Sequence, residues 1–409
     1  MREEKKLNDL IEVVLKSMHE AKFADGTVKI YKHIFARLQK LASNRKEECY
    51  TTDLGEAFVL DSNHPGTGEY CHSRYCLHSR CMQFIESYIN TGVVDWSSNN
   101  VKAENHLKSG ELRILKERFD SFMLERGLKP NTREGYHRLV SYFLEFLEDQ
   151  GYASIAQIQE GDIVAFIILV CKEHYTSTSL GAHLPGLRLF LQTNENTKRF
   201  EHELPEHLPK KRDILKVYSD EEHERIINYL QESEKSLRDK AISLLALETG
   251  IRAVDICNLK LNCIDWEHDF IHIQQEKTGK ELYIPLKASF GNAIADYLLN
   301  ERPITNSEFV FLRKTAPFTP LSGHSACYKI LFDTVNESGI KSEGRIYGTR
   351  ITRHSTASRL LRQGVPLSVI SAVLGHGNPN SAMIYLTTED AKLAECTLPL
   401  PKGGMSHES

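Results

Sequence analysis

The chain has 409 residues, 41% of them hydrophobic and 26% charged, which is the composition of an ordinary folded protein with room for two or three domains. No uninterrupted apolar run approaches the length of a membrane span, and charges are mixed throughout the N-terminal segment, unlike in a cleavable signal. We therefore expect a cytoplasmic protein without a membrane partner. Nine cysteines at irregular spacings favour reduced core thiols over a disulfide framework.

The formal net charge of -4 argues against a surface that is basic all over, as in many nucleic-acid-binding proteins. Basic residues are nevertheless concentrated locally. Residues 341–362 contain one lysine and five arginines against a single acid, and residues 210–212 are all basic. Such clusters either bind phosphate or form solvated helix faces and linkers, and charge alone leaves both interpretations open.

Helical periodicity dominates residues 108–201. Two amphipathic segments there end at Gly127 and Gly151, and two further helices follow. This pattern predicts a compact domain of about four helices.

Residues 1–107 contain a weaker version of the same pattern. Thr27 precedes Tyr31 by the spacing that separates Thr132 from Tyr136, and each tyrosine opens an amphipathic stretch. The segment is predicted to be helical, and it is either a degenerate copy of the second module or a chance match.

Residues 202–216, rich in Pro, Glu and Lys, have no periodic apolar face and are predicted to be a linker. A capping box formed by Ser219 and Glu222 then begins a new domain, predicted to cover residues 217–409. This domain combines helices with one β-hairpin, in which segments of alternating apolarity flank the turn 277–280. The expected fold class is mainly α with a small β-hairpin or sheet (α+β).

Two basic residues of this domain lie at the ends of predicted elements. Arg252 follows a helix that ends at Gly250, and Lys277 opens the turn of the hairpin. An arginine after a helix-ending glycine is usually a cap or a surface ion pair, and a turn lysine is usually solvated. Neither residue indicates a function by itself.

A later helix places Arg350, Arg353 and His354 in its first two turns, where positive charge opposes the helix macrodipole. An anion bound between these three potential cations would explain their position. Further along, His376 follows a helix stopped by a glycine, and Tyr385 lies on the succeeding stretch. Considered singly, the position of His376 is typical of a helix C-cap, and that of Tyr385 is typical of a half-buried core residue.

Four segments together resemble the ordered motifs of the tyrosine recombinase (phage integrase) family: TGIRAVDICNL, EKTGKELYIPL, TRHSTASRLLRQG and LGHGNPNSAMIYL. They occur in the family's order and at similar spacing, with Tyr385 nine positions after His376. The resemblance spans roughly residues 210–390, and residues 108–200 are similar to the family's core-binding domain in size and position. It implies helical N-terminal and core-binding (SAM-like) domains followed by a mixed, mostly helical catalytic domain.

The activity implied by the resemblance is site-specific DNA recombination, in which strands are cleaved and rejoined through a 3′-phosphotyrosyl intermediate to integrate or excise a mobile element. Tyr385 is then the nucleophile, Arg252 and Arg353 hold the phosphate, Lys277 protonates the leaving 5′-oxygen, and His376 donates a further hydrogen bond. No cofactor and no metal are implied, because the arginines supply the positive charge that a metal would otherwise supply.

One position departs from the family pattern. Arg350 stands three residues before Arg353, where the family typically has a histidine. Arginine has no acceptor and does not deprotonate, so this position is restricted to phosphate binding. Asp255, near Arg252, matches an acidic position of the family and is expected to orient its neighbours.

The implied partner is double-stranded DNA, held in a clamp by a homo-oligomer, a tetramer on two sites, with accessory DNA-bending or directionality proteins as candidate helpers. The protein would be cytoplasmic and associated with the nucleoid when bound to DNA. The segment after Tyr385 is expected to form an amphipathic tail that packs on a neighbouring protomer.

Two other functions remain open at this point. A type IB topoisomerase uses similar Arg, Lys, His and Tyr chemistry to relax supercoils, and a catalytically inactive DNA-binding protein or an unrelated helical regulator would leave Lys277 and Tyr385 without a role. The core-binding-like domain and the LGH motif favour recombination.

A cluster of cysteines and histidines in the N-terminal segment contains enough ligands for zinc: Cys71, Cys76, Cys81, His64, His72 and His78. The spacing of five between successive cysteines matches none of the usual zinc-binding patterns, and such steps do not line one face of a helix. We therefore expect core cysteines on a basic helix here, with a metal site as the alternative.

Overall fold

The computed structural model describes residues 5–96, 107–208, 216–321, 323–341, 344–378, 383 and 385. Most of these residues are helical, and one small antiparallel sheet completes the regular structure, which confirms the predicted fold class. None of the described helices combines the length and the apolarity needed to cross a bilayer.

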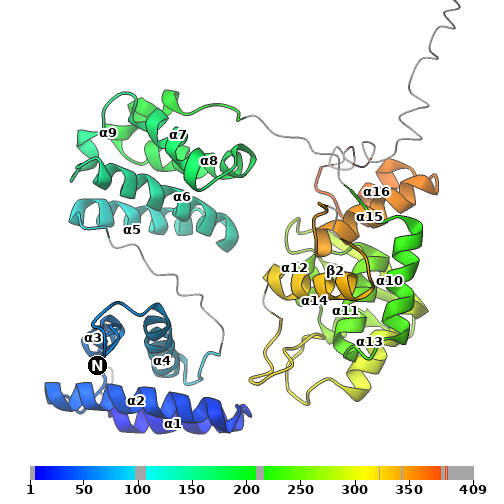
Figure 1. Cartoon of the computed structure of the whole chain (residues 1–409), viewed down its shortest axis with the longest axis horizontal. Coiled ribbons are helices and arrows are strands. Elements are labelled where there is room, and N and C mark those ends of the chain that lie inside the picture. Colours follow the sequence, from blue (N-terminus) through cyan, green and yellow to red (C-terminus); the bar gives the residue numbers. More distant parts are fainter. Residues whose placement is uncertain are drawn as a thin grey trace, which may run out of the picture. The chain divides into compact units, whose positions relative to one another are not determined.

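Residues 5–96 build four helices around one hydrophobic core (Figure 1): α1 (Leu7–Glu20), α2 (Asp25–Arg45), α3 (Thr52–Leu60) and α4 (His72–Thr91). Apolar residues recur along one side of α2 at helical spacing, and those on that side are buried: Val28, Tyr31, Ile34, Phe35, Leu38 and Ala42. The ring of Tyr31 lies 5.5 Å from that of Phe84 in α4. The segment therefore has a core of its own.

Residues 107–208 form a second helical bundle with its own core. Its main helices are α5 (Gly110–Glu125), α6 (Pro130–Asp149), α7 (Asp162–Glu173) and α8 (Ser177–Gln192), followed by the short α9 (Glu195–Lys198) and a 3-10 turn, Arg199–Glu203. The four helices predicted here are present. Leu204 packs into the same core, so part of the segment predicted as a linker is packed.

Residues 216–378 form a third assembly, centred on α11 (Leu237–Thr249). The other helices are α10 (Asp220–Glu232), α12 (Ala253–Cys257), α13 (Ala288–Asn300), α14 (Gly323–Glu337), α15 (Thr349–Arg362) and α16 (Leu367–Val373). The capping box of Ser219 and Glu222 is present at the start of α10. Every residue of α11 from Ala241 to Leu247 is buried, as expected of a helix surrounded by neighbours.

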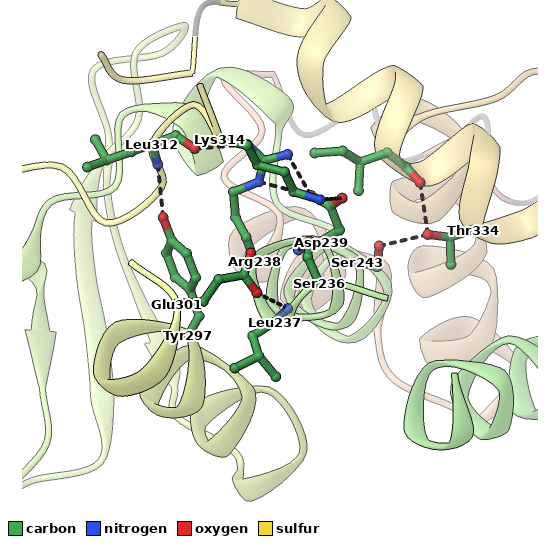
Figure 2. Close-up of polar contacts among 11 residues, drawn as sticks. Ser236, Leu237, Arg238, Asp239, Ser243, Tyr297, Glu301, Leu312, Lys314 and Thr334 are labelled. Atoms are coloured by element: carbon green, nitrogen blue, oxygen red, sulfur yellow. Dashed lines mark hydrogen bonds and ion pairs between the residues drawn. The ribbon is translucent and has the colours of Figure 1, made fainter. Parts of the chain in front are cut away.

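The start of α11 is anchored by a buried arginine (Figure 2). Arg238 donates to Asp239 Oδ1 from Nε and Nη2, at 2.9 and 2.7 Å, and to the Leu312 carbonyl from Nη1 at 2.9 Å. Lys314 donates to Asp239 Oδ2 at 2.9 Å. Burial raises the pKa of Asp239, but the hydrogen bonds and charges of Lys314 and Arg238 outweigh it and lower the pKa below its ordinary value. The buried cation is thus paired, which fixes one end of the helix that leads to the site.

The sheet has the strand order β1 (Ile264–Asp265), β2 (Phe270–Gln274), β3 (Glu281–Pro285), with both pairs antiparallel. The hairpin of β2 and β3 confirms the prediction, and Ile271 and Ile273 point to the buried face. The sequence did not reveal β1, because two residues are too few to show an alternation.

Candidate active site

The corner between α11 and α12 depends on a glycine. Gly250 ends α11 with φ of +63°, a conformation that residues with a Cβ rarely adopt. A Cβ there would also lie 3.3 Å from the Cα of Arg353 and 3.2 Å from the Cβ of Thr356, both in α15. Glycine therefore lets α15 approach the end of α11, and it brings Arg252 next to Arg353.

The two arginines converge on the backbone that precedes His376. Arg353 donates to the Gly250 carbonyl at 3.1 Å and to the Leu374 carbonyl at 2.6 Å, and Arg252 donates to the Gly375 carbonyl at 3.3 Å. Burial, together with the charge of Arg252, lowers the pKa of Arg353 to about 10, so the guanidinium stays protonated at neutral pH. The pair thus forms a fixed positive centre.

Gln275 connects this centre to the hairpin, and no role was predicted for it from the sequence. Its side chain, only 1% exposed, accepts from Arg252 Nη1 and from Thr278 Oγ1, each at 2.8 Å, and donates to the Leu374 carbonyl at 3.2 Å. The signal was present, because the alternation of β2 continues from Ile271 and Ile273 to position 275 and places a polar side chain on the buried face.

The exit of α16 also requires a glycine, because it passes directly over Gln275. Gly375 has φ of +63°, and a Cβ there would overlap the Gln275 Oε1 atom. Lys280, from the hairpin turn, donates to the His376 carbonyl at 2.9 Å. The segment that carries His376 is therefore held in place by Gln275, which packs under Gly375, and by Lys280, which binds the His376 carbonyl. No role was predicted for Lys280 from the sequence.

Tyr385 lies against this segment and is 2% exposed. Its hydroxyl oxygen is 3.5 Å from Nε2 of His376, and the two rings stack at a centroid distance of 6.0 Å. Burial raises the pKa of Tyr385 despite the charge and the hydrogen bond of Arg353 and the charge of Arg252. The phenol is therefore protonated in this structure, and two guanidiniums stand ready to stabilise a phenolate.

Both histidines of the cluster are neutral at physiological pH. Burial, then the charges of Arg353, Arg252 and Lys280, lower the pKa of His376 to about 4. Burial and the charges of Arg350 and Arg353 lower the pKa of His354 to about 4 as well. The start of α15 thus carries two cations, and His354, the third potential cation, is neutral because burial and the neighbouring arginines disfavour its protonated form.

The six predicted catalytic residues divide into two groups. Four of them come together in the buried cluster just described: Arg252, Arg353, His376 and Tyr385. Lys277, in the turn between β2 and β3, and Arg350, in the first turn of α15, are exposed. Within the described part of the chain, neither makes a side-chain hydrogen bond or an ion pair.

Asp255 links α12 to the hairpin. Its Oδ1 accepts from the backbone N–H of Glu276 at 3.0 Å, and its Oδ2 lies 3.9 Å from Arg252 Nη1. Burial raises the pKa of the Asp255 carboxyl above its ordinary value, even though the backbone hydrogen bond and Arg252 act in the opposite direction. This geometry suits a residue that orients its neighbours.

Of the cysteines and histidines predicted as a possible zinc cluster, His64 lies before α4 and the others lie at its start or along it. Cys71 occupies the N-cap position without a side-chain capping hydrogen bond, Cys76 Sγ lies 3.4 Å from His72 Nε2, and Cys81 is buried. Among the residues that the structure describes, no three histidine, cysteine or acidic side chains are arranged to hold a metal ion.

Comparison with known proteins identifies the family. The model of the "Phage integrase family" matches residues 216–392, and that of the "Phage integrase, N-terminal SAM-like domain" matches residues 116–196. The protein y4gC of Sinorhizobium fredii (strain NBRC 101917 / NGR234), an integrase/recombinase by its name, is 34% identical over 40% of this chain and 84% of its own length. This chain belongs to the phage integrase family.

Other similar proteins agree with this membership. The tyrosine recombinase XerA of Pyrococcus furiosus is 26% identical over 68% of this chain and 91% of its own length. For y4rF, a further integrase/recombinase by name from the Sinorhizobium strain, the identity is 32% and the chain spans only 39% of its length. Membership makes this chain a tyrosine-type, site-specific recombinase by class.

The fold is similar to that of the XerH site-specific recombinase in its complex with difH substrate. The TM-score is 0.55 at 18% identity, and the similarity covers 71% of this chain and 97% of that one.

Replacing Gln275 tests whether it supports the arginine pair. Gln275→Leu removes the acceptor of Arg252 and Thr278 and the donor to Leu374, and we expect it to lower the free energy of unfolding by about 1–3 kcal/mol, measured in urea. Gln274→Leu is the matched control, because that side chain is exposed and makes one hydrogen bond at 3.3 Å. Equal losses in both variants would contradict a special role for Gln275.

The two depressed histidine pKa values predict acid sensitivity. Between the folded value of about 4 for His354 and His376 and an unfolded value of about 6.5, the unfolded chain binds more protons, so stability falls as the pH drops through this range. The melting temperature should therefore decrease from pH 7 to pH 5. His354→Asn should reduce this decrease, because it removes one of the two buried histidines.

Proposed function

We propose that this recombinase cleaves one strand of duplex DNA with Tyr385 and rejoins it to a partner strand, integrating or excising a mobile element. The observation that carries this proposal is the position of the Tyr385 hydroxyl, within reach of His376 Nε2 and hydrogen-bonded to Arg353, beside Arg252.

The cleavage step forms a bond between the Tyr385 oxygen and phosphorus and breaks the bond from phosphorus to the 5′-oxygen. His376, expected from the resemblance to donate a hydrogen bond, is proposed instead to accept the phenol proton through Nε2, which faces the hydroxyl at 3.5 Å. Lys277, exposed in the turn, supplies the proton that the departing 5′-oxygen requires. The phosphotyrosyl ester replaces a phosphodiester, so the energy of the broken bond is conserved. The 5′-hydroxyl of the partner strand can therefore attack this ester, reform a phosphodiester and release Tyr385 without an external energy source.

Arg252 and Arg353 stabilise the charge that develops on the non-bridging oxygens. Each guanidinium has five N–H donors, and the backbone carbonyls and Gln275 occupy only some of them. The remaining donors are held in fixed directions before DNA binds, which avoids reorganisation in the transition state. A bound phosphate would also offset the positive field that depresses the His376 pKa, so substrate binding makes His376 a better base.

The experiment that tests the nucleophile is a nicked suicide duplex carrying the target site, which must first be selected from DNA libraries. Wild-type protein should form an adduct that survives denaturation, and Tyr385→Phe should form none. Tyr283→Phe is the matched control, because Tyr283 is an exposed tyrosine of β3 in the same domain. An adduct formed by Tyr385→Phe excludes the assignment, and relaxation of plasmids without site preference would indicate a type IB topoisomerase instead.

Substitutions in α15 distinguish the roles of the two arginines in its first two turns. Arg350 is exposed, so Arg350→His should keep or raise the rate of adduct formation. Arg353→Lys removes the planar fork that holds Gly250 and Leu374, and we expect the rate to fall about 100- to 1000-fold. An inactive Arg350→His protein would show that the family position has been misassigned.

The active form is proposed to be a tetramer on two DNA sites, assisted by accessory DNA-bending or directionality proteins. Among solved structures of similar fold, at 19% identity and a TM-score of 0.52, is a lambda integrase dimer bound to a COC' core site. The amphipathic tail expected after Tyr385 lies outside the described residues. Its packing on a neighbouring protomer remains part of the proposal.

A further inference from the structure

The outward face of α2 carries positive charge along its length, with one acid, Asp25, at the first position of the helix. From Gly26 to Lys46 the sequence contains no acid, and the exposed cations of the helix interior are Lys29, Lys32, Arg37 and Lys40, with His33 between them. We call these five residues the α2 stripe. Residues 5–96 as a whole contain as many acidic as basic side chains, so the charge is segregated on this helix and is not a property of the whole bundle.

The stripe lies on the side of α2 opposite to the core. Steps of three, four and seven residues separate its members, and the buried residues, from Val28 to Ala42, recur at the same spacing on the other side of the helix. None of the four Lys and Arg side chains makes an ion pair with a carboxylate in the described part of the chain. Arg45, beyond the stripe, is paired with Glu47 at 2.7 Å. The stripe is therefore available to an external anion.

The bundle that carries the stripe repeats the design of residues 107–208. Buried positions recur at one fixed offset between the second helices of the two bundles: Ile34, Phe35, Leu38 and Ala42 in α2, and Leu139, Val140, Phe143 and Leu147 in α6. Tyr31 packs on Phe84 of α4, and Tyr136 packs on α8, where a Cβ at Gly186 would overlap its ring. In both bundles the second helix thus packs on the fourth through an equivalent tyrosine.

This equivalence supports the expectation that residues 1–107 are a degenerate copy of the second module. It also relates the stripe to the segment matched by the SAM-like domain model, because Lys32 and His33 correspond to His137 and Arg138 of α6. The copy has more basic residues on this helix than the module it resembles: Lys40 stands where α6 has Glu145. This face is therefore more positively charged in the N-terminal bundle than in the second.

We propose that the α2 stripe binds the phosphate backbone of duplex DNA that flanks the cleaved site. The inference rests on the proposed function, which makes DNA the substrate. From Lys29 to Lys40 the helix rises about 16 Å, at about 1.5 Å per residue, and duplex DNA carries one charge per about 1.7 Å of its axis. The stripe therefore spans several phosphates. A membrane surface fits less well, because Ile30 is the one large apolar side chain exposed on this helix in the described structure.

The test compares two double charge reversals in the full chain. Lys29→Glu/Lys32→Glu alters the stripe, and Lys6→Glu/Lys16→Glu alters exposed lysines at α1 and changes the net charge equally. Binding to a long duplex of arbitrary sequence is measured across a series of salt concentrations. Each lost phosphate contact reduces the slope of log K against log salt by about 0.9, so we expect a slope about 2 smaller for the stripe variant and an unchanged slope for the control.

Two further measurements separate this proposal from folding and from the chemistry. Lys29→Gln/Lys32→Gln, with residues of similar helix propensity, should show the same reduction of slope without charge reversal, and its melting temperature should equal that of wild type. Equal slopes for stripe and control variants would overturn the proposal. If the stripe variants lose slope but no Tyr385 adduct forms with wild type, the stripe stands and the proposed nucleophile fails. If adducts form on a short core duplex while the slopes of the stripe and control variants do not differ, the assignment of Tyr385 as nucleophile stands and the stripe proposal fails.

Discussion

Burial of the Arg353 guanidinium is the constraint on which the site depends. A cation removed from water needs acceptors, and here backbone carbonyls at the ends of two helices provide them, Gly250 at the end of α11 and Leu374 at the end of α16. Carbonyls at the end of a helix have no hydrogen-bond donor within the helix, so these two can accept hydrogen bonds from the buried guanidinium. Three separate segments are thereby fixed around one side chain.

The same positive centre sets the protonation of the groups around it. Burial is the larger cause of the low pKa values of His354 and His376, and the charge of the centre lowers them further; the same charge opposes the rise that burial causes at Tyr385. A neutral imidazole therefore faces a protonated phenol beside two guanidiniums, and their positive charge favours the binding of an anion. This is the electrostatic state expected of a site prepared for a phosphodiester.

The sequence could predict what lies along the chain. The end of α11 at Gly250, the hairpin, the capping box of Ser219 and the helix from Thr349 all follow from local patterns, and they appear in the structure where expected. The sequence did not predict the role of Gln275, because its partners are 23 and 99 positions away and no local pattern records such contacts. The sequence left the charge of His354 open for the same reason, since it depends on burial and on nearby arginines that only the packed structure reveals.

The sequence alone therefore sufficed to identify the family and to single out Tyr385, through the types, the order and the spacing of the motif residues. Tertiary structure decided which of those residues share a site: Arg252, Arg353, His376 and Tyr385 meet in a buried cluster, whereas Lys277 and Arg350 remain exposed. The physical reason is that burial, hydrogen bonding and pKa depend on neighbours in space. A sequence pattern specifies the neighbours along one helix or strand, and the packing of α11, α15 and α16 specifies the rest.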